Sequence, residues 1–130
     1  MTIRAIEPED IDTAADWWRL RGQGVFWREA LPPIGVVAED ASGPAGMCWL
    51  ANWCNVGIAQ AEWLIMRPGL TLAQAGAAGG ALMAGVESAA KAVGYSHVLA
   101  YALPACARYL RRMGWDEVDD RPKIAMLKTL

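Results

Sequence analysis

The sequence predicts an α/β (α+β) fold in which helices pack on a mixed, mostly antiparallel sheet. A helical periodicity extends from Leu72 to Val93, short apolar runs separated by turn residues precede it, and another apolar run follows Gly94. Such periods distinguish helices from strands. Of the 130 residues, 55% are hydrophobic and 20% are charged. We therefore expect one folded domain, residues 1–130, with a sizeable core.

The first strand is expected at Thr2–Ile6, and Glu7-Pro8-Glu9-Asp10 then opens a helix. Proline suits a first-turn position, and acidic side chains there interact favourably with the helix dipole. This helix should end near Gly22. Its apolar face comprises Ile11, Ala14, Ala15 and Trp18.

Three antiparallel strands should follow the break at Pro32-Pro33. The runs Gly35–Glu39 and Ala45–Ala51 are separated by turn residues, which predicts a hairpin. A third strand, from about Gly57 to Met66, leads towards the long helix.

The long helix carries clear end signals. Thr71 and Gln74 form a capping-box pattern, and Gly94 is placed as a left-handed stop. Only Glu87 and Lys91 are charged inside it, so most of the helix should be buried or covered. Its interior glycines each cost roughly 1 kcal/mol relative to alanine. Either close packing or close approach of a ligand accounts for them; they are Gly76, Gly79, Gly80 and Gly85.

The remaining segments predict a strand, a short helix and a hairpin. Ser96–Ala102 is apolar on both faces, as a covered parallel strand should be. A helix should follow from Pro104 to Met113 and stop at Gly114. Trp115–Val118 and Lys123–Lys128 are expected to pair as a hairpin.

Composition excludes several classes of function. The net charge of −2 and the pI near 5.3 argue against a nucleic-acid partner. Cys48, Cys54 and Cys106 lack CxxC spacing, and with His97 as the one histidine we expect no metal site. We expect neither a secretion signal nor a membrane-spanning stretch, and hence a cytoplasmic protein without a membrane partner.

Three stretches of the chain resemble the GNAT superfamily of acyl-CoA-dependent N-acetyltransferases. Ile3–Ile11 is similar to the family's first strand and helix start, Met66–Leu82 to its pyrophosphate-binding segment, and Leu110–Trp115 to its terminal helix ending in Gly-Phe. The resemblance implies a three-layer α/β/α domain, acetyl-CoA as co-substrate, and transfer of the acetyl group by direct attack of an unidentified amine.

The resemblance also implies a coenzyme site. The strand at Leu64, Ile65 and Met66 would hydrogen-bond the pantetheine arm, and the following loop and helix start would hold the pyrophosphate. In one register the family's glycine pattern falls on Gln74, Ala75, Gly76, Ala77, Ala78 and Gly79, with Gly80 next. In the other register the phosphate loop is Thr71–Gly76. Both place a helix N-terminus, which attracts phosphate, at the same point.

Two residues are candidates for catalysis. Glu62 lies on the strand beside the expected thioester and could take a proton from the amine; the alternative is a carboxylate that faces solvent. The family often uses a tyrosine to protonate the departing thiolate, but Leu110 occupies that position here. Tyr109 is the nearest substitute, about 100° around the helix.

The seven tryptophans suggest an aromatic surface. Trp17, Trp18 and Trp27 could line an acceptor pocket or a partner surface, although core packing is the alternative for each. A second function is therefore open: a GNAT-fold protein without catalysis that serves binding or assembly, similar to short GNAT-like proteins of phage and prophage genomes. A homodimer is plausible in either case.

Overall fold

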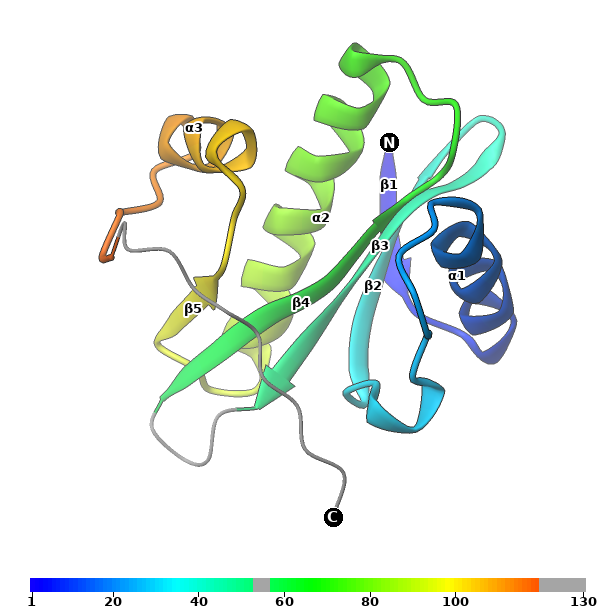
Figure 1. Cartoon of the computed structure of the whole chain (residues 1–130). Helices are drawn as coiled ribbons and strands as arrows, with labels where there is room; N and C mark the ends of the chain where they lie inside the picture. Colours follow the sequence, from blue (N-terminus) through cyan, green and yellow to red (C-terminus); the bar gives the residue numbers. More distant parts are fainter. Residues whose placement is uncertain (53–56, 120–130) are drawn as a thin grey trace.

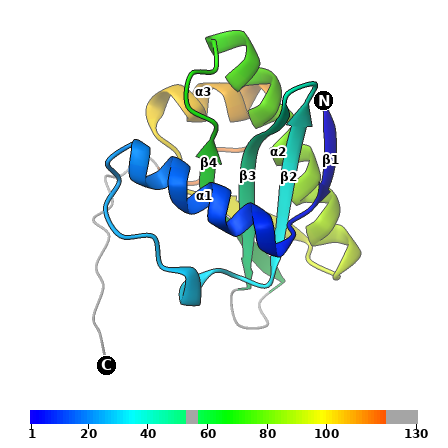
Figure 2. The same cartoon turned by 90° about the vertical axis from the view of Figure 1, so that its right-hand side faces the viewer.

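The computed structural model describes residues 1–52 and 57–119. These residues form one five-stranded sheet in the order β1-β2-β3-β4-β5, with helices on both faces (Figures 1 and 2). Helix α1 crosses one face, and α2 and α3 lie on the other, so the predicted α/β arrangement in three layers is confirmed. The elements are β1 (Thr2–Ala5), α1 (Pro8–Leu20), the 3-10 helix η1 (Arg28–Ala30), β2 (Ile34–Asp40), β3 (Gly43–Asn52), β4 (Ile58–Met66), α2 (Leu72–Ala92), β5 (His97–Ala100) and α3 (Pro104–Arg112).

The sheet is mixed and mostly antiparallel, as predicted. Strands β1 to β4 pair antiparallel with their neighbours, whereas β5 is parallel to β4. The hairpin between β2 and β3 closes at the pair Asp40 and Gly43. Gly43 has φ +99°, a left-handed conformation that glycine adopts without steric cost.

An ion-pair cluster joins β1, α1 and β2. At the start of α1, Asp10 accepts a hydrogen bond from the backbone N–H of Glu7 at 2.8 Å, which forms half of a capping box. Arg4 of β1 donates to Asp10 Oδ2 at 2.6 Å and to Glu39 of β2 at 2.9 Å. Asp10 is 5% exposed, so its carboxylate is buried, whereas its partner Arg4 is only half-buried.

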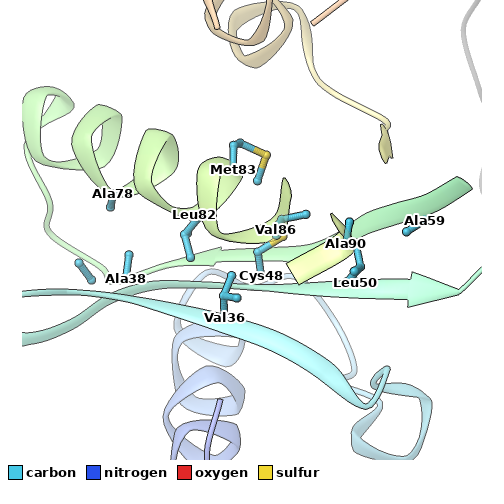
Figure 3. Packing of buried hydrophobic residues seen from close by; sticks show 11 residues of the cluster. Val36, Ala38, Cys48, Leu50, Ala59, Ala78, Leu82, Met83, Val86 and Ala90 are labelled. Atoms are coloured by element: carbon cyan, nitrogen blue, oxygen red, sulfur yellow. The ribbon is translucent and has the colours of Figure 1, made fainter. Parts of the chain in front are cut away.

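The core has two halves because side chains alternate along each strand. Val36, Ala38, Cys48 and Leu50 pack towards α2, and Figure 3 shows Leu82 and Val86 of α2 pointing at these strands. The intervening residues Val37, Met47 and Trp49 pack towards α1. We call these the α2-side core and the α1-side core.

Helix α2 begins and ends as predicted. Thr71 and Gln74 form the capping box, and Gly94 has φ +93° just after the helix. The prediction that most of the helix is buried holds for its middle, where Ala78, Leu82, Met83, Val86 and Ala90 are buried. It is wrong for the ends, since Leu72 is 91% and Val93 is 54% exposed. Both lie outside the part of α2 that contributes to the core.

The glycines of α2 are mostly explained by close packing. A Cβ at Gly85 would lie 2.9 Å from Ile3 Cγ2, and one at Gly80 would lie 2.6 Å from Tyr109 Oη. A Cβ at Gly79 would contact Met66 at 3.4 Å. Only at Gly76, among these four, would a Cβ meet open space.

Two predictions near the C-terminus differ from the structure. Strand β5 was expected to be covered on both faces, but His97 is exposed and the next three residues are only half-buried, because β5 is the edge strand of the described sheet. Trp115–Val118 is not a strand. Instead, Trp115 Nε1 donates to Glu87 at 2.8 Å and Glu117 pairs with Arg111, which ties the segment to α2 and α3. The predicted second hairpin strand, Lys123–Lys128, lies outside the described residues, as does Cys54.

Candidate functional site

Strand β5 pairs with only the first part of β4. Their parallel pairing runs from Ile58 and His97 to Ala61 and Ala100. Beyond that point β4 continues to Met66, while the chain after β5 turns towards α3 (Figure 1). The second half of β4 therefore presents a backbone edge that β5 does not cover.

A β-bulge lies at the start of this uncovered half. Glu62 pairs with Trp49 and Ile65 pairs with Met47, so Trp63 and Leu64 together lie opposite Cys48. Trp63 has φ +53°, a left-handed conformation that costs a non-glycine residue of order 1–3 kcal/mol. Bulges redirect side chains and interrupt the alternation of a strand. This one lies immediately after Glu62.

Aromatic packing holds the bulge in place. The Trp63 ring lies 5.1 Å from that of Trp18 and 5.6 Å from that of Phe26, and Trp18 and Phe26 are 6.1 Å apart. We call Trp18, Phe26 and Trp63 the aromatic trio. It belongs to the α1-side core, so α1 and the segment after it hold the strained strand from one side.

Glu62 lies on the same face of the sheet as the aromatic trio. Its cross-strand partner Trp49 belongs to the α1-side core, and directly paired residues share a face. Glu62 is half-buried rather than fully exposed. Its backbone carbonyl accepts from Cys48 Sγ at 3.4 Å, and burial raises the pKa of that thiol to about 12, so Cys48 stays protonated at neutral pH.

The three strand residues predicted to contact pantetheine differ in exposure. Leu64 is 44% exposed, Ile65 is buried in the α1-side core, and Met66 packs against the α2-side core. A ligand along this edge of β4 would therefore contact the backbone of Ile65 rather than its side chain. Such contacts depend on the path of the strand rather than on side-chain identity.

A loop of five residues, 67–71, joins β4 to the N-terminus of α2. The first N–H groups of a helix lack partners one turn earlier. Thr71 and Gln74 satisfy each other in the capping box, with Thr71 N–H donating to Gln74 Oε1 at 2.9 Å and Gln74 N–H to Thr71 Oγ1 at 3.3 Å. The N–H groups of Leu72 and Ala73 lie between them at the open helix end.

The predicted glycine pattern lies mostly beyond this end. Gln74 is in the first turn, but Ala75 N–H already bonds to Thr71 O at 2.9 Å. The following residues of the pattern lie inside α2, where the helix uses their N–H groups; they are Gly76, Ala77, Gly79 and Gly80. This geometry favours the register that places the phosphate loop at Thr71–Gly76.

Tyr109 reaches this end of α2 from α3. Its hydroxyl donates to the carbonyl oxygen of Gly76 at 2.8 Å and lies over Gly80. Leu110, at the position of the family's tyrosine, packs against the α2-side core instead. For Tyr109 to protonate a thiolate, its bond to Gly76 would have to open.

The predicted acceptor-side tryptophans are only partly brought together. Trp17 and Trp18 pack against the α1-side core, and Trp18 stands beside Trp63. Trp27 is 47% exposed at the start of η1. The sequence did not predict Phe26 or Gln60 as part of this site. Strand alternation could have placed Gln60 on the same face of the sheet as Glu62, two residues later.

Within residues 1–52 and 57–119 no group of three or more His, Cys, Asp and Glu side chains could hold a metal ion. In the same residues no helix has the length and apolar character needed to cross a membrane.

Comparison with known proteins places this geometry in a known fold. No protein-family model and no curated protein matches the sequence. Among solved structures, a Trypanosoma brucei acetyltransferase aligns over 96% of this chain and 99% of its own, with a TM-score of 0.69 and 12% identity. A Mycobacterium tuberculosis protein solved with CoA aligns over 96% of this chain and 77% of its own (TM-score 0.70, 14% identity).

An aminoglycoside N-acetyltransferase, also solved with CoA, aligns over 98% of this chain and 100% of its own, with a TM-score of 0.67 and 12% identity. Identities this low establish the fold and not the activity. The chain therefore has a GNAT-like fold, shared over nearly its whole length with acetyltransferases.

Proposed function

We propose that this protein is an acyl-CoA-dependent N-acyltransferase that transfers the acetyl group of acetyl-CoA to an amine by direct attack. The observation that carries the proposal is the part of β4 beyond Ala61, which β5 does not cover and which contains the strained bulge at Trp63, on the strand that leads to the N-terminus of α2. The likeness to folds solved with CoA supports it.

In this proposal the coenzyme binds mainly through backbone groups. The pantetheine amides pair with the free edge of β4 between Glu62 and Met66. The pyrophosphate lies at the N-terminus of α2, where the N–H groups of Leu72 and Ala73 and the helix dipole favour negative charge. Binding of this kind tolerates the degenerate glycine pattern.

The chemical step then needs few side chains. An alkylammonium has a pKa near 10 and must lose a proton before its nitrogen can attack; Glu62 accepts that proton directly or through water and releases it to solvent. The nitrogen then bonds to the thioester carbon and gives its second proton to Glu62, the carbon–sulfur bond breaks, and the thiolate leaves. Backbone N–H groups of β4 polarise the thioester carbonyl, usually the largest single contribution. Tyr109 or solvent protonates the thiolate.

The assignment of Glu62 is tested by thiol release from acetyl-CoA in the presence of primary amines. Glu62→Gln should lower turnover by about 10²–10⁴-fold at neutral pH, and the loss should shrink above about pH 10, where the ammonium loses its first proton without help from Glu62. Glu29→Gln makes the same change at an exposed position and should leave turnover unaltered. Equal pH profiles for Glu62→Gln and the unmutated protein would remove Glu62 from the mechanism.

A second candidate is coenzyme binding without transfer, in a binding or assembly protein. Two features favour it. Leu110 occupies the position at which the family often has its tyrosine and packs against the α2-side core, and the Tyr109 hydroxyl is already bonded to Gly76. This alternative predicts acetyl-CoA binding with no thiol release for any amine. A dimeric state that Trp17 or Trp18 substitutions disrupt would support it further.

A further inference from the structure

Two buried polar side-chain atoms of the described residues lack a hydrogen-bond partner: Gln60 Oε1 and Trp18 Nε1. Gln60 as a whole is only 7% exposed. Buried amide oxygens are nearly always paired, and leaving one unpaired is costly. The orphaned oxygen of Gln60 is therefore free to accept a hydrogen bond from a donor that the described residues do not supply.

Gln60 points to the face of the sheet that carries Glu62. Its neighbours Ala59 and Ala61 both contact the α2-side core, so Gln60 projects to the opposite face. Glu62, two residues on, projects to that same face, roughly 7 Å further along the strand. Gln60, the candidate base Glu62 and Trp63 of the aromatic trio therefore follow one another along β4.

The position of Gln60 along β4 also suits a substrate contact. It pairs with Leu99 of β5, one pair before the last, so it lies just before this pairing ends. Trp18, which carries the second orphaned atom, packs at a tilt against Trp63, the residue after Glu62. Gln60 and Trp63, the strand residue that Trp18 contacts, thus flank the candidate base along β4.

We infer that Gln60 Oε1 holds the acceptor by accepting an N–H of a primary amine. This rests on the proposed function. A deprotonated primary amine has one lone pair and two N–H bonds. With the lone pair directed at the thioester carbon, one N–H faces Glu62, which takes that proton as the carbon–nitrogen bond forms and the carbon–sulfur bond breaks. The other N–H bonds to Gln60. A secondary amine has a single N–H and cannot satisfy both groups.

The test compares matched amines on the unmutated protein and on Gln60→Leu, which keeps the size of the side chain and removes the acceptor. The probes are phenethylamine and propylamine, each beside its N-methyl derivative. The unmutated protein should prefer each primary amine by about tenfold or more in kcat/KM, the value of one hydrogen bond. Gln60→Leu should raise KM for the primary amines about tenfold, abolish the preference, and leave KM for acetyl-CoA unchanged.

A merely structural glutamine would behave differently. Because the unpaired oxygen is removed, Tm of Gln60→Leu should be equal to or above that of the unmutated protein. The control Gln23→Leu, at an exposed position, should alter neither selectivity nor Tm. An unchanged amine preference in Gln60→Leu, a markedly lowered Tm, or acetylation of none of the four probes would overturn the inference.

Calorimetric titration with acetyl-CoA separates the two possible failures. If acetyl-CoA binds and the Gln60 prediction fails, the proposed coenzyme site survives and only the role of Gln60 is lost. If acetyl-CoA does not bind, the proposed function fails and the inference fails with it.

Discussion

At the scale of single residues, Asp10 shows how the fold depends on one buried charge. Its hydrogen bonds from Arg4 lower its pKa, and the backbone N–H of Glu7 adds to this, while desolvation acts in the opposite direction. A carboxyl whose pKa is lower in the folded than in the unfolded state stabilises the fold above its unfolded pKa, which is near 4. That stabilisation disappears as the pH falls through the folded value.

Substitution of Asp10 should therefore have a pH-dependent effect. Asp10→Asn leaves Arg4 without its buried partner and should cost about 1–3 kcal/mol of unfolding free energy at pH 7. Urea unfolding at pH 7 and at pH 3 should show the difference between variant and unmutated protein shrinking at the lower pH. Asp16→Asn, on the exposed face of α1, should cost little at either pH. A difference for Asp10→Asn that does not change with pH would contradict the ion-pair explanation.

At the scale of elements, the glycines of α2 divide into one free position and several packed ones. Gly76→Ala adds a methyl group to open space inside a helix and should raise the free energy of unfolding by up to about 1 kcal/mol. Gly85→Ala places its Cβ 2.9 Å from the stiff β-branched Ile3, so the clash should offset the gain and lower stability. Thermal unfolding should give a higher Tm for Gly76→Ala and a lower Tm for Gly85→Ala. An equal rise in Tm for both variants would show that Gly85 is not packed as described.

The N-terminus of α2 can be tested through its charge. Ala73→Asp places a carboxylate at the helix start, where it should stabilise the helix by about 0.3–1 kcal/mol and yet repel a pyrophosphate. We expect a higher Tm together with acetyl-CoA binding weakened about tenfold or more. The control Ala84→Asp changes another exposed alanine of α2, away from its start, and should leave binding intact. Equal weakening of acetyl-CoA binding by both variants would show that the phosphates do not bind at the N-terminus of α2.

The sequence correctly predicted those helix ends and turns that depend on residues close together in the chain. The capping box of Thr71 and Gln74, the stop at Gly94 and the hairpin turn before Gly43 all appear as expected, because each depends on residues close in the chain. The exposure of β5 and the irregular course of Trp115–Val118 were mispredicted. Edge position and the contact of Trp115 with Glu87 are tertiary features, and an apolar run does not reveal them.

The candidate site was predictable only in part for the same reason. Glu62 could be placed on its strand, but its neighbours could not, because the bulge at Trp63 depends on packing with Trp18 and Phe26 from a distant segment. The register of the phosphate loop was left open by the glycine pattern. The position of the capping box decides where free N–H groups occur, and it favours the register that begins at Thr71.

At the scale of the whole molecule, the fold is shared with two acetyltransferases and with a protein solved with CoA, at 12–14% identity. Few side chains are common at such identities, so what carries over is the course of the backbone. The proposed coenzyme contacts are of this kind: the free edge of β4, its bulge, and the first turn of α2. A fold can lose or change its chemistry, and the coenzyme site must therefore be tested on this chain itself.

The most direct test is calorimetric titration of the purified protein with acetyl-CoA and, separately, with desulfo-CoA. Micromolar binding of both is the predicted result, because the pyrophosphate and pantetheine contacts do not involve the sulfur. Ala73→Asp should weaken both to the same extent. No heat of binding with millimolar concentrations of either ligand would contradict the coenzyme site and with it the proposed acyl transfer.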